Sequence, residues 1–376
     1  MIADTKRFEI QPVLDGALVE VAIFLDRWGT HRDQGSSVPR LVRANSPSTV
    51  RRLRWLLVDN PLAPAASDHG LCIRDASGVI VGLLLSFPSA FRVDDQRLLG
   101  LCSGSYFVEP QARTLGFYLF KRHLNHPGYS FFFSTTCNAD SGALWKMLGA
   151  CAPANSDAEY ILPLDLEAVL PAFLAGRTSS AFAARLAQIF GRCTNPVLHR
   201  FARKSAGVFT EPCRDWEKLA ALSRRHRPAH WITTDRSAAF LEWRYGPSSP
   251  NHSSDICVFR DRRGNEGWFC LGDAIRGNRV QIRGRALLDA TWPREKMSFD
   301  EVLQAISRFA VPNADAIYFR PRPGLDEGEG SRWIIRRRMD PPPIFAIPGK
   351  RGAPLAVSSL DLVPADGDSS FAVSGS

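Results

Sequence analysis

The sequence predicts an α/β protein with two mixed central sheets, each flanked by helices. Short apolar runs typical of strands alternate with amphipathic stretches typical of helices. The element order β α α β β β α β α occurs twice, once before residue 165 and again after residue 207. The 376 residues are enough for two domains of ordinary size, and 45% hydrophobic residues support real cores rather than a disordered chain.

The first half predicts a run of strands and helices that ends near Leu164. Asp15 and Ser48 are placed to cap two helices, and the turn from Asp75 to Gly78 joins two strands as a hairpin. A strand, a helix and a parallel strand that follow form one crossover unit, which should be right-handed. The expected strands are 8–13, 70–74, 79–87, 96–108, 129–136 and 160–164, and the expected helices follow Asp15, Ser48 and Pro110 and begin near Asp140.

The second half predicts the same order after an Ala/Leu-rich helical stretch. Ser298 and Glu301 have capping-box spacing at the start of its main helix. The tail after Arg338 is Pro-rich, and its polar end, from Asp366 to Ser370, is expected to be loose. The expected strands are 208–211, 255–259, 267–274, 279–289, 316–320 and 344–347, and the expected helices follow Asp215, Ser237 and Ser298, with a short one at 330–338.

The net charge of +9 is unevenly distributed. Residues up to Leu186 hold 18 Lys and Arg against 17 Asp and Glu, and the rest of the chain holds 29 against 21. Such a basic half suits an anionic partner, such as the phosphates of CoA, a nucleotide-linked sugar, an acidic polysaccharide or RNA. Because the arginines are dispersed, a solvated surface with no such partner is an equal alternative.

The cysteines and the N-terminus bear on metal binding, disulfides and location. The eight cysteines form no C-x-x-C pair, which favours buried thiols over a zinc site or a disulfide framework. We expect no metal. The N-terminus lacks the apolar core of a signal peptide, and no apolar run approaches the roughly 20 residues that span a bilayer. We therefore expect a cytoplasmic protein without a membrane span.

The most informative stretch is the strand–turn–helix between Gln96 and His126. The strand breaks at Glu109-Pro110, and the helix that follows starts with an arginine and carries Gly116 in its first turn. A helix N-terminus presents free N–H groups and the positive end of the helix dipole, and a glycine there lets a ligand approach the backbone. This combination can bind a phosphate or a pyrophosphate.

The order V-x-P-x-x-R-x-x-G resembles the acyl-CoA cradle of the GNAT acyltransferase superfamily, whose signature is Gln/Arg-x-x-Gly-x-Gly/Ala. The matching residues here are Arg113 and Gly116, while Tyr118 replaces the small third residue. A second element is similar to the family's N-x-x-A/S-x-x-x-Tyr-x-x-x-Gly pattern. Its positions are Asn138, Ser141, Trp145 and Gly149.

The resemblance covers about residues 8–165 and implies two tandem GNAT-like domains. We expect an N-terminal GNAT-like domain with the acyl-CoA cradle over 1–165, a helical connector over 166–206, a second, degenerate GNAT-like domain over 207–350 and a tail over 351–376. The second domain has no Arg/Gln-x-x-Gly element where its main helix starts.

The implied reaction is acyl transfer from acetyl-CoA or another acyl-CoA to a small-molecule amine, with an amino sugar or an amino acid as candidate acceptor. The family pattern implies that the strand end pairs with the pantetheine arm, that the helix start holds the pyrophosphate and that the second element contacts the arm. The residues implied for the co-substrate are Phe107, Val108, Arg113, Thr114, Leu115, Gly116, Phe117, Tyr118, Asn138 and Ser141.

The catalytic candidates lie at the end of the same strand. Tyr106 and Glu109 are the leading candidates for the base that takes a proton from the incoming ammonium, with Ser103, Ser105 and Asp140 as further candidates. Strand alternation places Tyr106 on one face with Gly104 and Val108, and the two serines on the other. Packing of Tyr106 in the sheet, and a capping role for Asp140, are the structural alternatives.

A further departure from the family concerns the leaving group. In many family members the Tyr of the second element protonates the thiolate, but Trp145 stands there and has no titratable proton. His123 and His126, further along the first helix, are expected at the surface.

Two other functions fit the sequence. A Fem-type peptidyl transferase also has a tandem GNAT-like fold, and the basic second half would suit its aminoacyl-tRNA, although the CoA pattern argues against a nucleic-acid partner. The other is a degenerate tandem that binds CoA without turnover. Neither the acyl chain nor the oligomeric state follows from the sequence.

Overall fold

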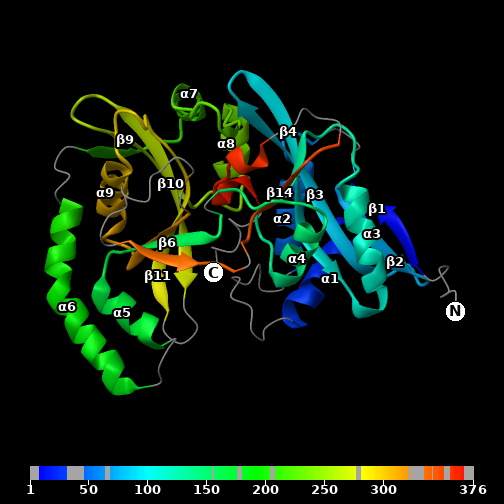
Figure 1. The fold of residues 1–376 in the computed structure, drawn as a ribbon, viewed down its shortest axis with the longest axis horizontal. Helices are drawn as coiled ribbons and strands as arrows, with labels where there is room; N and C mark the ends of the chain where they lie inside the picture. The colour runs from blue at the N-terminus through cyan, green and yellow to red at the C-terminus, as the bar shows by residue number, and fades with distance from the viewer. Residues whose placement is uncertain are drawn as a thin grey trace.

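The computed structural model describes residues 8–31, 46–63, 68–154, 156–175, 180–203, 208–276, 281–320, 322, 334–340, 342–350 and 356–367. Two mixed sheets lie side by side with helices packed around them (Figure 1). This confirms the expected α/β class with two sheets. None of the helices within these ranges is long and apolar enough to cross a membrane.

Along its main path the first sheet is antiparallel except for one parallel pair, β4 and β5. Its strands, in spatial order, are β1 (Phe8–Pro12), β2 (Gly70–Asp75), β3 (Ile80–Val93), β4 (Gln96–Val108), β5 (Phe131–Ser134) and β14 (Phe345–Pro348). Its helices are α1 (Leu18–His31), α2 (Ser46–Leu53), α3 (Arg113–His123) and α4 (Ala139–Met147).

The apolar alternation along these strands supplies two faces. Leu84 and Leu101 pack with Phe120 of α3 and Trp145 of α4, while Leu85 belongs to the core beneath α1 and α2. The sheet is therefore covered by helices on both faces.

The second sheet also contains one parallel pair, β11 and β12. Its strands, in spatial order, are β13 (Ile335–Arg338), β6 (Ala158–Pro163), β12 (Ala316–Phe319), β11 (Ile282–Thr291), β10 (Glu266–Arg276), β9 (Asp255–Arg260) and β7 (Phe209–Pro212). Its helices are α5 (Leu166–Ala175), α6 (Ala181–Arg203), α7 (Trp216–Arg225), α8 (Ala238–Tyr245) and α9 (Phe299–Ala310).

The two sheets exchange strands. Strand β6, expected to complete the first sheet, instead lies between β12 and β13 of the second. Strand β14, near the end of the chain, pairs with β5 of the first sheet, and β8 (Ile232–Thr234) pairs with β3. The strands before and after residue 165 are therefore not divided between the two sheets as expected. The sequence of a strand shows which of its faces is buried, but not which strands pair with it.

Four local expectations are wrong. Ser48 lies inside α2, which begins at Ser46, and therefore does not cap it. Residues 335–338 form strand β13 rather than part of a helix, while 330–333 lie outside the described residues. Asn138, not Asp140, caps α4. Asp15 begins a 3₁₀ turn before α1 and contacts His69 at 2.5 Å instead of capping the helix.

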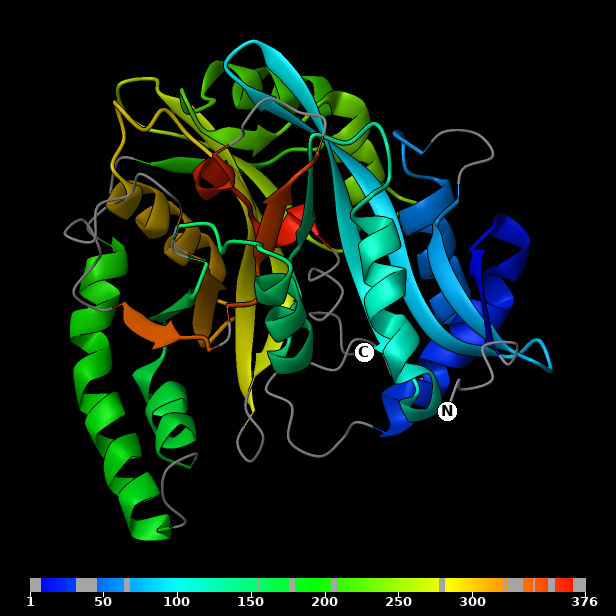
Figure 2. The same cartoon turned by 45° about the vertical axis from the view of Figure 1, so that its right-hand side comes forward.

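The C-terminal segment, residues 356–367, is ordered against the protein rather than loose. Leu360 and Asp361 form β15, which pairs in parallel with β8. Asp361 and Ala365 are fully buried. This segment reaches the region between the two sheets (Figure 2), and the rest of the expected tail lies outside the described residues.

An indole pair joins α8 to the π-helical turn Arg54–Val58 that follows α2. Trp55 and Trp243 stack at 4.8 Å, and each indole N–H donates to the other's backbone carbonyl, at 2.7 and 2.9 Å. Arg244, which is buried, lies 5.3 and 5.5 Å from the two rings and donates to the carbonyl of Gly367. One cluster thus holds segments from the first half, the second half and the C-terminal segment.

We expect Arg244→Met to lower the free energy of unfolding by about 2–4 kcal/mol, because it leaves a buried carbonyl without its donor and removes both cation–π contacts. Arg263→Met, at an exposed position, should change it by less than about 0.5 kcal/mol. Urea unfolding of both variants makes the comparison, and equal effects would contradict the central role of this cluster.

Candidate functional site

Strands β4 and β5 form a fork. They pair only from Gly100 to Cys102 of β4 and from Phe131 to Phe133 of β5. Strand β4 then continues to Val108 with no β5 partner. The helix α3 starts just beyond the end of β4, as the sequence predicts.

A β-bulge interrupts β4 inside the fork. Leu83 faces Phe107 across the ladder, but Leu85 faces Gly104, so two residues of β4 lie opposite one of β3. One of the two, Ser105, has a left-handed φ of 51°. The expected alternation therefore breaks at this point. A bulge of this kind frees backbone groups from the ladder and redirects the side chains beyond it.

Beyond the bulge, successive side chains of β4 again point to opposite faces of the sheet. Tyr106 and Val108 pack on the α3 side, whereas Phe107 packs against the core on the opposite face. The Tyr106 ring meets Phe120 edge-on at 5.5 Å. Burial raises the pKa of the Tyr106 hydroxyl, so this phenol stays protonated at neutral pH and can donate a proton but not accept one.

The N-terminal turn of α3 is open. No side chain caps it, and Arg113, Thr114, Phe117 and Tyr118 are exposed. Leu115 is half-buried. An uncapped helix start of this kind is suited to binding an anion.

Packing beneath α3 also requires a glycine at position 116. A Cβ on it would lie 2.5 Å from the Tyr106 hydroxyl oxygen and 3.1 Å from Cγ2 of Val108. The close approach that it permits is therefore to Tyr106 beneath the helix.

The second catalytic candidate is held by an ion pair. Arg27 of α1 contacts the Glu109 carboxylate at 2.9 Å, and Gln111 donates to its other oxygen. Tyr106 packs beneath α3 instead, so the two candidates have different partners.

The second sequence element forms the start of α4. Asn138 Oδ1 accepts from the Ser141 N–H and Ser141 Oγ accepts from the Asn138 N–H, both at 2.9 Å. These side chains thus make a capping box. Trp145 is buried and meets Phe120 at 4.9 Å with perpendicular rings, so the position of the family's tyrosine belongs to the core here.

His123 is a buried residue that the sequence reading placed at the surface. Its Nδ1 lies 2.9 Å from Ser86 Oγ, and its ring packs between Phe120 and Phe132. Burial, with a smaller effect of His126, lowers its pKa to about 3. Its helical spacing from Leu119 and Phe120 could have shown this.

The second sheet has a fork of its own. Strands β11 and β12 pair only from Gly284 to Ala286, with α9 as the crossover helix and a bulge between β10 and β11. Arg322, which follows β12, donates to the carbonyl of Ala290 at 2.5 Å.

The C-terminal segment lies at this second fork. Asp361 accepts from Arg322 at 3.0 and 2.7 Å and from Arg294 at 2.9 Å. Burial would raise the pKa of Asp361, but the two arginines outweigh it and lower that pKa. Burial beside Arg322 lowers the pKa of Arg294 to about 10.

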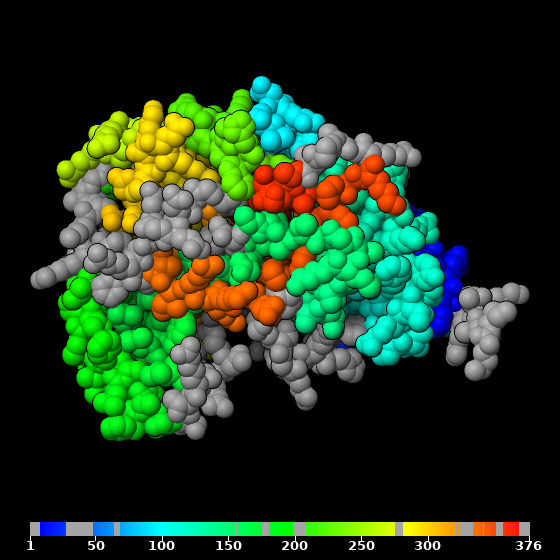
Figure 3. All heavy atoms as spheres, viewed as in Figure 1, coloured from blue at the N-terminus to red at the C-terminus, as the bar shows by residue number. Residues whose placement is uncertain are grey.

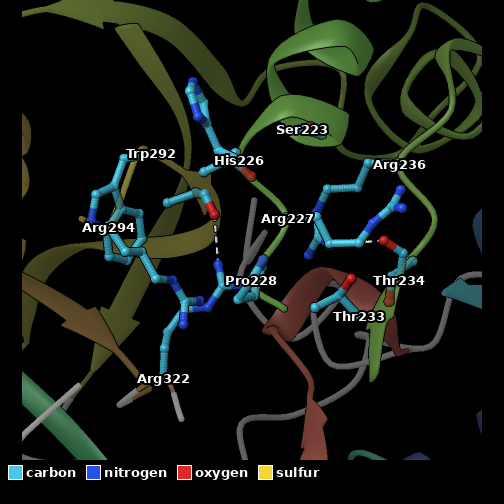
Figure 4. A pocket seen from close by; sticks show the side chains of 12 residues that line it. Ser223, His226, Arg227, Pro228, Thr233, Thr234, Arg236, Trp292, Arg294 and Arg322 are labelled. Atoms are coloured by element: carbon cyan, nitrogen blue, oxygen red, sulfur yellow. Dashed lines mark hydrogen bonds between the residues drawn. The ribbon is translucent and has the colours of Figure 1, made fainter. Parts of the chain in front are cut away.

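A small pocket beside this cluster is lined by polar and basic side chains (Figure 4). Arg236 lies on its wall and bonds to Asp289 at 2.6 Å. The second fork is thus closed by the chain's own ion pairs and offers no counterpart to the open start of α3.

All eight cysteines are free thiols. Within the described ranges, no three His, Cys, Asp or Glu side chains come together as a metal site would require.

No family model matches the chain, and no curated protein matches its sequence. The chain has the fold of the GNAT-type acyltransferases, as comparison with solved structures shows.

Three of these structures show the extent of the likeness. A probable N-acyltransferase from Enterococcus faecalis V583 has a TM-score of 0.54 at 9% identity, over 91% of this chain and 73% of that one. The Saccharomyces cerevisiae N-myristoyltransferase with bound myristoyl-CoA gives 0.51 at 14% identity, over 83% and 76%. A GCN5-related N-acetyltransferase from Anabaena variabilis gives 0.51 at 10% identity, over 90% and 72%.

The contact under α3 predicts an energetic coupling. Gly116→Ala should destabilise the protein by about 1–3 kcal/mol, since its Cβ would collide with the Tyr106 hydroxyl. Tyr106→Phe removes that oxygen, so the double variant should lose clearly less than the sum of the two single losses. Urea unfolding of the four proteins measures the coupling, and simple additivity would contradict it.

His123 predicts a specific loss of stability in acid. The fold favours the neutral imidazole, so its contribution is complete above the unfolded pKa near 6.5 and falls as the pH drops towards 3. The slope should be about 1.4 kcal/mol per pH unit within that window. His123→Gln should flatten the stability profile between pH 7 and about 5, whereas His126→Gln should keep it. Urea unfolding at several pH values distinguishes the two.

Proposed function

We propose that this protein transfers an acyl group from acyl-CoA to an amine. The observation that carries the proposal is the bulged, one-sided end of β4 beside the uncapped start of α3. The amine nitrogen attacks the thioester carbonyl, the C–S bond breaks, and the CoA thiolate leaves and takes up a proton. The amine loses a proton in turn.

In this proposal the backbone provides most of the site. Free N–H groups in the first turn of α3, such as those of Thr114 and Leu115, bind the pyrophosphate. Phe107 and Val108 pair with the pantetheine arm along the open side of β4. Backbone groups freed by the bulge at Ser105 polarise the thioester carbonyl. Asn138 and Ser141 act by fixing the start of α4 next to the arm.

We assign Tyr106 the role of proton donor to the departing thiolate. Burial raises the pKa of its hydroxyl, so the phenol is protonated at neutral pH and has a proton to give. Glu109 is assigned to hold the end of β4 through Arg27. Acetyl is the first acyl group to test, and an amino sugar or an amino acid is the first acceptor.

The test reverses the charge at each end of α3. Arg113→Glu should weaken acyl-CoA binding about tenfold or more, or about 1.4 kcal/mol, because it repels the pyrophosphate. A carboxylate at a helix N-terminus interacts favourably with the helix dipole and stabilises the helix, so this variant should stay folded. Arg122→Glu makes the same change of charge in the last turn, where it should alter binding by less than about twofold.

Calorimetry with acetyl-CoA and longer acyl-CoAs, and with an acyl-pantetheine that lacks the pyrophosphate, makes the measurement. Arg113→Glu should leave acyl-pantetheine binding unchanged. If the wild type binds no acyl-CoA, the fold stands but the proposed reaction is wrong. Strong, salt-dependent tRNA binding would then favour the Fem-type reaction, for which the basic second half is the specific observation.

A further inference from the structure

Helix α6 exposes an apolar stripe that no described residue covers. Its buried face contains Ala187, Gly191 and Leu198. Gly191 lies against α5, where a Cβ would come within 2.4 Å of the Leu166 carbonyl oxygen. The α6 stripe consists of Phe182 (72% exposed), Leu186 (51%), Ile189 (60%), Phe190 (63%) and Val197 (53%).

The α6 stripe is regular. At about 100° per residue its members fall on one face roughly 100° wide, the width by which an amphipathic helix normally contacts a core. Helix α6 already contacts its own core through a different face. It lies at the edge of the molecule (Figures 1 and 2), and with α5 it forms one end of the surface in Figure 3.

The charges on α6 indicate what covers the stripe. Residues 181–203 contain four arginines and no Asp or Glu. Arg185 and Arg192 are exposed, and Arg192 pairs with Glu167 of α5 at 2.7 Å. Two copies packed stripe to stripe would bring the arginines of both helices together, and α6 itself has no acid to pair with those of the other copy. An anionic surface attracts those arginines instead.

We propose that α6 docks this protein on an anionic lipid surface, with the α6 stripe inserted at the level of the headgroups. A helix with apolar side chains on one face and arginines beside them lies in the plane of such an interface. This docking does not depend on the proposed acyl transfer. It would bring the protein to acceptors or acyl donors held at a membrane.

The test measures co-sedimentation of the full chain with sucrose-loaded vesicles. One set is phosphatidylcholine, and the other contains about one part in three of phosphatidylglycerol. The wild type should partition about tenfold more strongly onto the anionic set. The difference should shrink between about 0.1 M and about 1 M NaCl, where the screening length falls from about 10 Å to about 3 Å.

Matched double variants on α6 and α1 show which surface binds the vesicles. Leu186→Ser/Ile189→Ser should weaken binding to anionic vesicles about tenfold or more. Val19→Ser/Ile23→Ser changes two α1 side chains that are each 56% exposed, and should leave binding unchanged. Both double variants should keep the thermal unfolding midpoint of the wild type, since all four side chains are more than half exposed.

Three outcomes would overturn the proposal. One is equal binding to the two vesicle sets, and another is an α6 double variant that binds as the wild type does. The third comes from sedimentation equilibrium: a wild-type dimer that Leu186→Ser/Ile189→Ser converts to a monomer would make α6 an interface between copies of the chain.

Discussion

The arrangement of this molecule depends on the reciprocal contact between Trp55 and Trp243. Two indole N–H groups that would be costly to bury each find the other's backbone carbonyl, and the stacked rings hold Arg244 beside them. Arg244 in turn fixes Gly367. Segments some 190 and 120 residues apart in the chain thereby become neighbours, and the exchange of β6 and β14 between the sheets makes the two halves interdependent. A description as two separable domains is therefore less apt than one of two sheets that share strands.

The two forks have the same arrangement of strands and helix, but the first is open and the second is closed by other parts of the chain. Each is a parallel strand pair that separates beside a bulge, with a helix as crossover. In the first, β4 remains unpaired on one side and α3 begins without a cap. In the second, Arg322 and Arg294 hold Asp361 of the C-terminal segment at the opening. A buried carboxylate with two guanidinium partners is costly to expose, so this segment is not expected to leave the fork readily. The asymmetry favours one donor site in the protein.

The arginines of the second half lie in two kinds of surroundings. Some of them are internal: Arg236 and Arg322 neutralise Asp289 and Asp361, which lie in the middle of the molecule. Others lie outside, on α6, beside exposed apolar side chains. The sequence alone left solvated charges and an anionic partner as equal alternatives. The structure shows that the arginines are not equally available to a partner, because some of them are paired with buried acids.

The sequence by itself determined the class of the fold, the strand–turn–helix from β4 to α3 and the arginine at the start of α3, because these depend on local periodicity and on residues close together in the chain. It also placed the capping box of α9 correctly at Ser298 and Glu301. Only the tertiary structure decided which sheet receives β6 and β14, why residue 116 is a glycine, and that the C-terminal segment closes the second fork. Those features depend on contacts between distant residues, such as Gly116 with Tyr106 or Arg322 with Asp361, and neither partner shows from its own surroundings in the chain which residue it will meet.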